Sequence, residues 1–229
     1  MNYLIAAHHA WNEDEFKKIS KRTDLGKFFF ISKKEDLNLE KLSKINPKYI
    51  FFPHWSFMVP IEILDKYECV CFHMTDLPFG RGGSPLQNLI SKGFIETKIT
   101  ALRMTKELDA GPIYIKKKMK LEGRAETIYK RASRIIFKMI ENIVLTSPRP
   151  TKQRGKVVNF KRRKAEDSKI KNISSIERMY DFIRMLDAPG YPHAFLETKE
   201  YKFVFKNARL DKGKQLEAKV IITERESND

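Results

Sequence analysis

The sequence has 229 residues, of which 41% are hydrophobic and 32% are charged, and its formal net charge is +16. This length allows one large domain, or one domain with a small appendage, and the composition excludes a disordered chain. Residues 1–111 hold 16 basic and 14 acidic side chains, whereas residues 112–229 hold 29 and 15. The basic second half suits either a phosphate-bearing partner, such as nucleic acid, a nucleotide or an anionic membrane, or simply solvated helix faces.

The two cysteines and the apolar runs indicate the compartment. Cys69 and Cys71 lie two residues apart on a predicted strand, a spacing that suits neither a disulfide framework nor a zinc site. The first residues lack the basic start and long apolar core of a signal peptide. The longest apolar region, residues 49–64, is broken by Pro53 and Pro60 and is too short to span a bilayer. We therefore expect a cytoplasmic protein with no membrane partner.

The first half of the chain alternates short apolar runs with helical patterns. Strands are predicted over 2–7, 26–32, 48–53 and 68–74. Helices are predicted over 12–22, 38–45 and 60–67, the first of them capped by Asn12. Strand–helix alternation with continuously apolar strands is typical of a parallel sheet covered on both faces. The expected fold class is α/β, a Rossmann-like, mostly parallel sheet with helices on both faces.

The second half continues this pattern and then changes. A helix over 84–93, strands over 97–104 and 113–121, and an amphipathic helix over 124–145 are predicted. Residues 146–156 read as a linker. A helix over 174–190, with a capping box of Ser174 and Glu177, and short strands over 193–199, 201–206 and 215–224 follow. The predicted domains are residues 1–148, carrying any catalytic site, and a small C-terminal α+β appendage at 149–229.

One histidine stands out by its position. His73 ends the predicted fourth strand and is followed at once by "MTDLPFGRGGSP", a stretch rich in turn residues. In parallel α/β sheets, ligands bind beyond the carboxyl ends of the strands. A second unusual turn, "ELDAG", contains Asp109. A carboxylate there could fix the imidazole tautomer and favour its protonated form, as acid–base catalysis requires.

The segment "FHMTDLPFGRGGSPLQ" resembles the active-site segment of the formyltetrahydrofolate-dependent formyltransferases. That family includes methionyl-tRNA, glycinamide ribonucleotide and sugar N-formyltransferases. His73 matches the family histidine, and Leu108 to Gly111 match the second family motif, Leu-Asp-x-Gly. The family asparagine, which donates a hydrogen bond to the developing oxyanion, falls on Cys71. A thiol is a much weaker donor, so Cys71 is a doubtful catalytic residue.

The resemblance implies an enzyme that uses 10-formyltetrahydrofolate and no metal. His73 and Asp109 would be catalytic. The folate would lie against a set of residues close to this pair: Thr75, Asp76, Leu77, Pro78 and Leu108.

Further candidates for substrate binding surround this pair. Arg81 and Gly82 follow the histidine, and Arg81 would meet folate or a substrate phosphate, although a loop whose glycines only permit positive φ is an equal alternative. His9, Trp11 and Trp55 follow the first and third strands and so lie at the same sheet edge. The alternative for the tryptophans is packing in a strand-to-helix turn.

The short C-terminal part is the sequence feature from which we predict the formyl acceptor. Methionyl-tRNA enzymes carry a full C-terminal barrel, so the sequence favours formyl transfer to a nucleotide-linked deoxyamino sugar for a surface polysaccharide. A tRNA acceptor is the alternative that the basic second half keeps open. A second alternative is a catalytically weak folate-binding relative, because of Cys71. Homodimers are common among the sugar enzymes, and a homodimer is left open here.

Overall fold

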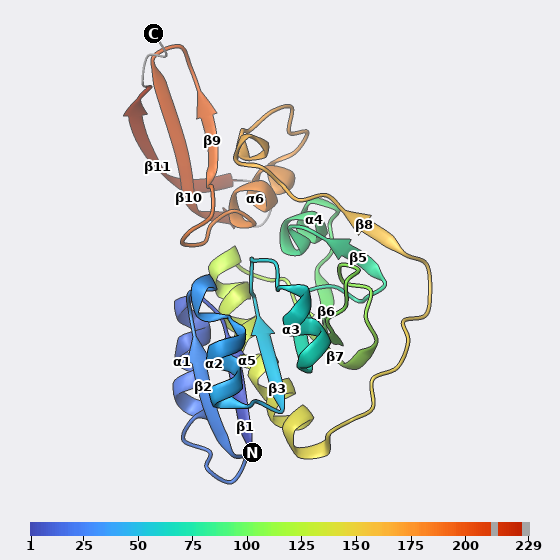
Figure 1. Ribbon diagram of the computed structural model, residues 1–229. Helices are drawn as coiled ribbons and strands as arrows, with labels where there is room; N and C mark the ends of the chain where they lie inside the picture. The colour runs from blue at the N-terminus through green and yellow to red at the C-terminus, as the bar shows by residue number, and fades with distance from the viewer. Residues whose placement is uncertain (212–214, 226–229) are drawn as a thin grey trace. The chain divides into compact units, whose positions relative to one another are not determined.

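The computed structural model describes residues 1–211 and 215–225, and its internal contacts divide the chain into two compact units. Unit 1 comprises residues 1–82, 97–119 and 129–159, and unit 2 comprises the remainder. Figure 1 shows the helices and strands that make up the two units.

Unit 1 is built on a six-stranded sheet with the strand order β2-β1-β3-β4-β6-β7. The strands are β1 (Asn2–Ala6), β2 (Lys27–Ile31), β3 (Tyr49–Pro53), β4 (Cys69–His73), β6 (Glu96–Arg103) and β7 (Ile113–Lys120). The pairings β1–β2, β1–β3 and β3–β4 are parallel, and β4–β6 is antiparallel. The predicted mostly parallel α/β sheet is confirmed.

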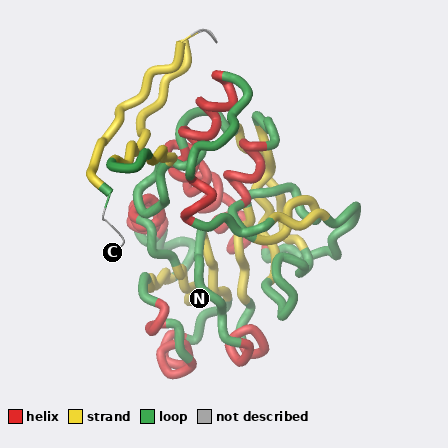
Figure 2. Tube along the Cα trace, turned by 90° about the horizontal axis from the view of Figure 1, so that it is seen from above, coloured by secondary structure: helices red, strands yellow, loops and turns green. Residues whose placement is uncertain are grey.

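Helices connect these strands and cover both faces of the sheet (Figures 1 and 2). They are α1 (Ala10–Ile19), α2 (Leu39–Ile45), α3 (Ile61–Lys66) and the long α5 (Ala125–Thr146), with a short 3₁₀ turn at Lys34–Asp36. The side chain of Ser133 on α5 donates to the Asn12 side chain on α1 over 2.8 Å. This bond joins two helices that share one face of the sheet.

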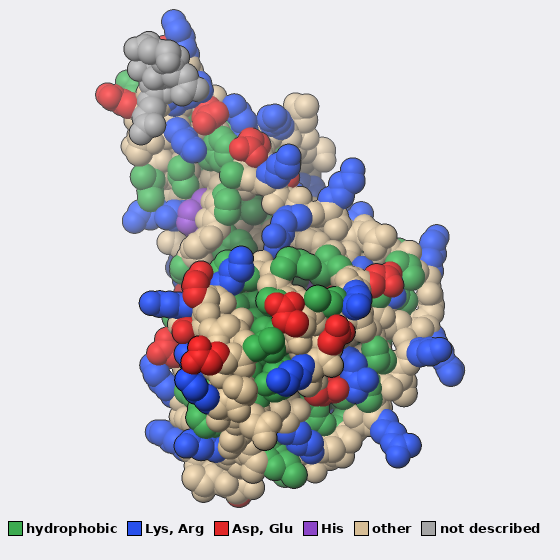
Figure 3. All heavy atoms as spheres, viewed as in Figure 1, with side chains coloured by type: hydrophobic (Ala, Val, Ile, Leu, Met, Phe, Trp, Pro, Cys, Tyr) green, Lys and Arg blue, Asp and Glu red, His purple; other side chains and the backbone are tan. Residues whose placement is uncertain are grey.

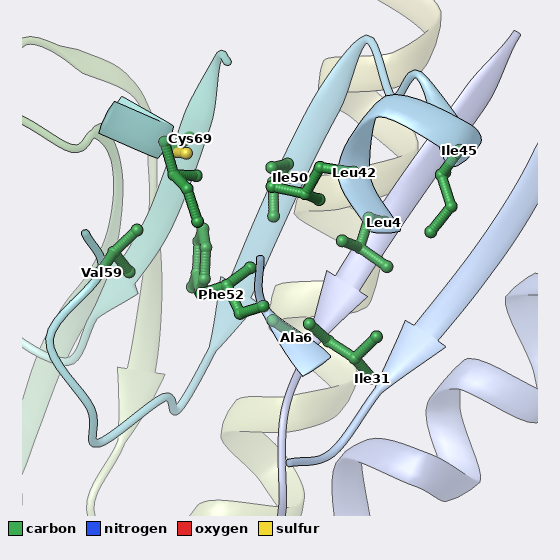
Figure 4. Close-up of a cluster of buried hydrophobic side chains, with 11 residues drawn as sticks. Leu4, Ala6, Ile31, Leu42, Ile45, Ile50, Phe52, Val59 and Cys69 are labelled. Atoms are coloured by element: carbon green, nitrogen blue, oxygen red, sulfur yellow. The ribbon is translucent and has the colours of Figure 1, made fainter. Parts of the chain in front are cut away.

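The strands bury side chains on both faces because successive residues point to opposite sides. One face carries a cluster that packs against α2 and α3 and includes Leu4, Ile50 and Phe52 (Figure 4). The other face carries aromatic rings, such as Tyr3 and Phe51, whose ring centroids lie 6.5 Å apart. Burial on both faces explains why the strands read as unbroken apolar runs rather than as alternating ones.

The strand order places a topological switch between β1 and β3. The chain runs from β1 to β2 on one side and then returns to form β3 on the other side of β1. The loops that follow β1 and β3 therefore lead away from each other at the carboxyl edge of the sheet, and α/β proteins bind ligands at such a switch point. β4, which ends at His73, is the next strand along that edge.

Two further strands of the structure have no counterpart in the sequence prediction. β5 (Phe79–Gly82) pairs with β8 (Val158–Phe160) in a two-stranded sheet. The prediction placed residues 79–82 in a loop and assigned no element to residues 158–160, because strands of three or four residues show no hydrophobic period. This small sheet ties the segment after α5 to the loop after His73.

Unit 2 contains α4 (Pro85–Ser91), a 3₁₀ turn at Ala165–Ser168, α6 (Ile176–Arg184) and a three-stranded sheet with the order β11-β10-β9. Its strands are β9 (Ala194–Glu197), β10 (Tyr201–Asp211) and β11 (Gln215–Glu224). Both neighbouring pairs are antiparallel. The predicted small α+β part, with one helix and three strands, is confirmed in its elements.

Two predicted helix starts are wrong. α1 begins at Ala10, so Asn12 does not cap this helix. The buried side chain of Asn12 instead donates to the carbonyl of Pro53 over 3.1 Å. α6 is capped by Ser175, whose hydroxyl accepts from the amide of Arg178, rather than by Ser174. Ser174 and Ser175 have the same intrinsic capping propensity, so the sequence by itself does not choose between them.

The domain boundary after residue 148 stays a prediction. No helix in the described residues has the length and apolar character needed to cross a membrane. The cytoplasmic location also stays a prediction.

Candidate active site

His73 is the last residue of β4, and both nitrogens of its imidazole face polar partners. Nε2 lies 2.7 Å from the carbonyl oxygen of Gly80, and Nδ1 lies 3.5 Å from Oδ2 of Asp109. Both side chains are about nine-tenths buried. The structure thus brings together the two residues that the sequence singled out, across a separation of 36 positions.

The carbonyl of Gly80 determines the tautomer of this histidine. A carbonyl oxygen only accepts hydrogen bonds, so Nε2 of His73 carries a proton and donates it to Gly80. Nδ1 is then the nitrogen that faces Asp109. The distance of 3.5 Å is longer than a tight charge-assisted bond, which leaves Nδ1 able to donate to a third group.

Backbone geometry holds Asp109 in place. Asp109 adopts a left-handed conformation with φ of 53°, and its Oδ2 accepts from the amide of Gly82 over 2.9 Å. Gly82 itself has φ of 103°, which side-chain-bearing residues rarely adopt. Gly111 packs so closely on the carbonyl of Arg103 that a Cβ would lie 1.8 Å from that oxygen. The glycines of both loops are therefore needed to present Asp109 to His73.

Gln153 connects these loops, and the sequence analysis missed it. Its Nε2 donates to the carbonyls of Asp109 and Gly111 over 2.7 and 2.9 Å. Its Oε1 accepts from Nε and Nη2 of Arg81 over 3.2 and 2.9 Å. One amide thus satisfies the Asp109 turn and the Arg81 loop together. Gln153 lies in the predicted linker, a segment that shows no hydrophobic period and no catalytic motif.

Arg81 is fully engaged in this arrangement. Besides Gln153, its guanidinium pairs with Glu107 over 3.3 Å, and its side chain is largely buried. Arg81 and Gly82 therefore lie beside the His73–Asp109 pair and support it. Contact of either residue with a substrate stays a prediction.

The residues predicted to meet the folate differ in exposure. Thr75, Leu77 and Pro78 are buried, and the Thr75 hydroxyl donates to the carbonyl of Gly80, so it is committed within the protein. Asp76 is half-buried and pairs with Lys98 and Lys116. Leu108 is 62% exposed. Of this set, Asp76 and Leu108 have side chains that are at least partly exposed, and contact of any of the five residues with folate stays a prediction.

Cys71 lies two residues before His73 on β4 and therefore on the same face of the strand. It is partly buried against the apolar cluster below α2 and α3. Burial, together with the nearby negative charge of Asp109, raises the pKa of the Cys71 thiol well above its ordinary value. The residue is thus a neutral thiol, a weak donor, at the position where the resembling family has an amide.

Three histidines gather at the switch between β1 and β3. The ring centroids of His8 and His9 lie 4.2 Å apart, and those of His9 and His54 lie 4.5 Å apart. Burial and then the charge of His8 lower the pKa of His9 to about 4. Burial and then both neighbours lower the pKa of His54 well below the usual value. These rings are therefore neutral at pH 7 and form an aromatic, uncharged surface.

The two tryptophans take different positions in this cluster. Trp11 is buried, with His9 stacked on it at 4.3 Å and Tyr129 at 5.5 Å between centroids. Trp55 is half-buried beside the exposed Phe57, and its indole Nε1 is buried without a hydrogen-bond partner. Substrate binding by His9, Trp11 and Trp55 stays a prediction.

Across residues 1–211 and 215–225, no group of three or more His, Cys, Asp or Glu side chains could hold a metal ion.

A buried imidazole paired with a carboxylate at the carboxyl edge of a Rossmann-like sheet is typical of α/β enzymes that act by acid–base catalysis.

Comparison with known proteins names the family. Residues 14–144 match the family described as "Formyl transferase", and residues 165–223 match "Methionyl-tRNA formyltransferase, C-terminal domain". The chain belongs to the formyl transferase family, as its sequence motifs indicated. Its expected membership of an enzyme family is confirmed.

Several individual proteins are similar to the chain. The structure of a methionyl-tRNA formyltransferase from Clostridium thermocellum has 45% sequence identity and a TM-score of 0.95, with 98% of this chain and 100% of that chain covered. A methionyl-tRNA formyltransferase from Thermodesulfovibrio yellowstonii is 26% identical over 179 residues, which are 75% of this chain and 58% of that protein. The chain spans about half the length of the curated relatives it matches.

Two more distant structures share the fold alone. HypX from Aquifex aeolicus, in complex with tetrahydrofolic acid, has 17% identity and a TM-score of 0.74, with 90% of this chain and 37% of that chain covered. A sugar N-formyltransferase from Shewanella sp. has 15% identity and a TM-score of 0.68, with 87% and 93% covered.

These findings overturn the predicted acceptor. The prediction of a nucleotide-linked amino sugar as acceptor is wrong, and so is the predicted role in polysaccharide synthesis. The ranking of tRNA as the less suitable partner is also wrong. The more similar relatives are methionyl-tRNA formyltransferases. The prediction relied on the short C-terminal part. The Clostridium thermocellum chain is covered completely, and residues 165–223 match a C-terminal domain of the tRNA enzymes, so a short C-terminal part does not exclude tRNA.

Proposed function

We propose that this protein transfers a formyl group from 10-formyltetrahydrofolate to the α-amine of methionyl-tRNA. The observation that carries the proposal is the 45% identity to the Clostridium thermocellum methionyl-tRNA formyltransferase over nearly the whole chain. The match of the C-terminal part to the corresponding domain of those enzymes supports the same acceptor. The folate complex of HypX, a protein with the same fold, supports a folate donor.

The reaction requires stabilisation of a developing oxyanion. The neutral amine attacks the formyl carbon, and the carbonyl oxygen becomes negatively charged as that carbon becomes tetrahedral. Nδ1 of protonated His73 can donate to this oxygen, because Nε2 is already bound to Gly80. The buried setting of the imidazole strengthens this electrostatic interaction, since little water competes for the charge.

Asp109 handles the proton that the amine must lose. The new C–N bond forms to the amine, the bond from the formyl carbon to N10 of the folate breaks, and a proton moves from the amine to N10. Oδ2 of Asp109 is anchored by the amide of Gly82, which orients the carboxylate and leaves Oδ1 as the oxygen to accept and return that proton. Oδ2 of the same carboxylate lies 3.5 Å from Nδ1 of His73 and so orients the imidazole.

Cys71 makes this site depart from the family pattern. Where the family places an amide donor for the oxyanion, the neutral thiol contributes little, and the Thr75 hydroxyl is occupied by Gly80. We propose that His73 carries most of the oxyanion stabilisation here. Loss of one such donor costs about 3 kcal/mol in other enzymes.

A labelling assay tests the function. The protein is incubated with 10-formyltetrahydrofolate and tRNA charged with radiolabelled methionine, and labelled formylmethionine is measured after deacylation. Uncharged tRNA and a nucleotide-linked amino sugar serve as control acceptors. Formylation of the charged tRNA alone supports the proposal. Retained folate binding without formylation of any acceptor would instead favour the catalytically weak folate-binding relative.

A further inference from the structure

A basic groove lies in unit 1 between β7 and the segment that contains Gln153. It has a volume of about 710 Å³ and is lined by Ile113, Lys116, Thr151, Lys152 and Arg154. Its two walls are joined by backbone hydrogen bonds between Ile113 and Thr151, at 2.7 and 2.9 Å in the two directions. Backbone hydrogen bonds therefore hold the two walls of the groove together.

The groove is coupled to the active site through one residue. Gln153 points inward, where its amide holds the carbonyls of Asp109 and Gly111. Its neighbours Lys152 and Arg154 are exposed and line the groove. Gln153 thus supports the Asp109 turn, while the residues immediately before and after it offer two cations to the groove.

The charge of the groove is only partly neutralised from within. Lys116 donates to Asp76, which also binds Lys98, so this small cluster retains one positive charge. Lys152 and Arg154 make no ion pair with any residue in the described ranges 1–211 and 215–225. Two uncompensated cations therefore remain in the groove.

The two chain segments that line the groove are basic along their length. Residues 113–118 and 147–156 together contain seven Lys and Arg residues and no Asp or Glu. Figure 3 shows Lys and Arg side chains projecting along the edge over which the segment between α5 and β8 runs. This excess suits a polyanion, because a ligand with two or three carboxylates would need far fewer cations.

We propose that this groove binds backbone phosphates of the single-stranded 3′ end of the acceptor RNA. The inference rests on the proposed function, in which the reacting amine is esterified to the end of that strand. Phosphates a few nucleotides from the amine then pass the groove while the amine reaches His73 and Asp109. Lys152 and Arg154 contact the phosphates. Gln153, which lies between them in the sequence, fixes their position relative to the turn that carries Asp109.

Charge reversal with a matched control tests the groove. The double variant Lys152→Glu/Arg154→Glu is compared with Lys33→Glu/Lys34→Glu, which makes the same charge change on an exposed segment of unit 1. Binding of tRNA is measured by fluorescence anisotropy from 50 to 250 mM salt. We expect the groove variant to bind at least about tenfold more weakly and with a log–log salt slope shallower by about 1.4, from two lost contacts to a single strand. The control should change affinity by less than about twofold.

Steady-state kinetics separate the possible outcomes. The KM for methionyl-tRNA should rise with the dissociation constant, and kcat should change by less than about threefold. A rise confined to the KM of triglutamyl relative to monoglutamyl 10-formyltetrahydrofolate would overturn the inference and assign the groove to the folate tail. Unchanged tRNA binding in the groove variant would also overturn it. If the wild-type protein binds tRNA in a groove-dependent way without formylating it, the proposed function fails and the groove assignment stands.

Discussion

Gln153 and Asp109 are 44 residues apart in the sequence and are joined by a 2.7 Å hydrogen bond from the Gln153 amide to the Asp109 carbonyl. A second bond to Gly111 and two from Arg81 complete the coordination of this one side chain. The segment after α5 thereby helps to hold the turn that carries Asp109, the carboxylate that we propose to be catalytic.

Replacing Gln153 should impair catalysis more than binding. Gln153→Ala removes both donors from the Asp109 turn, and we expect kcat to fall by about tenfold to a hundredfold, because small misplacements of a catalytic group are costly. The KM for the folate donor should change by less than about threefold. Gln153→Glu keeps an acceptor for Arg81 but loses the donors, so it should resemble the alanine variant. A wild-type kcat and an unchanged pH–rate profile in both variants would contradict this role.

The His73–Asp109 pair should behave as a unit. Asp109→Asn keeps an acceptor for the amide of Gly82, so the fold is expected to persist while kcat falls by about 10²–10⁴. His73→Ala should cost a similar factor through the lost oxyanion donor. The double variant should be little worse than either single one, since the two residues act together. Single-turnover kinetics on variants with unchanged circular dichroism provide the measurement; fully additive losses would argue for separate roles.

The cysteines should be unreactive in the folded protein. Burial, followed by the charge of Glu68, raises the pKa of Cys69 to about 12, and the pKa of Cys71 is also raised. A raised thiol pKa means less thiolate at any given pH, and the thiolate is the reactive form. We expect iodoacetamide to label neither residue appreciably at pH 8 in buffer and to label both in urea. Rapid labelling of Cys71 in the native protein would place that thiol in a different environment.

The histidines at the sheet edge should make stability depend on pH. His9 has a pKa of about 4 in the folded state against 6.5 when free, and those of His8 and His54 are also lowered. The unfolded chain therefore binds more protons as the pH falls below 6.5, so the free energy of unfolding should decrease from about pH 6.5 towards pH 4. Urea denaturation midpoints at pH 7.5 and 5.0 measure this effect. The variant His9→Phe should reduce the difference; an equal difference in the variant would point to other groups.

Features of the fold and of the candidate site could be predicted from the sequence where they depend on residues close together in the chain. The strands of unit 1 were predictable because each is a continuous apolar run between helical patterns, and burial on both faces requires that composition. The motif around His73 and the turn at Asp109 identified the family. The β5–β8 sheet was not predictable, since strands of four and three residues show no period. The choice of acceptor failed because it was argued from chain length, which no side-chain chemistry constrains.

Residue types and their local order determined the α/β class, the position of His73 at a strand end, and the need for glycine in the two loops, because helical and strand periodicity and backbone sterics act over a few residues. Tertiary structure alone decided that Nδ1 of His73 faces Asp109, that Gln153 bonds to the Asp109 turn, and that Lys152 and Arg154 line one groove with Lys116. Those relationships join residues tens of positions apart, and they exist only once the packing of the sheet has brought the loops to one edge.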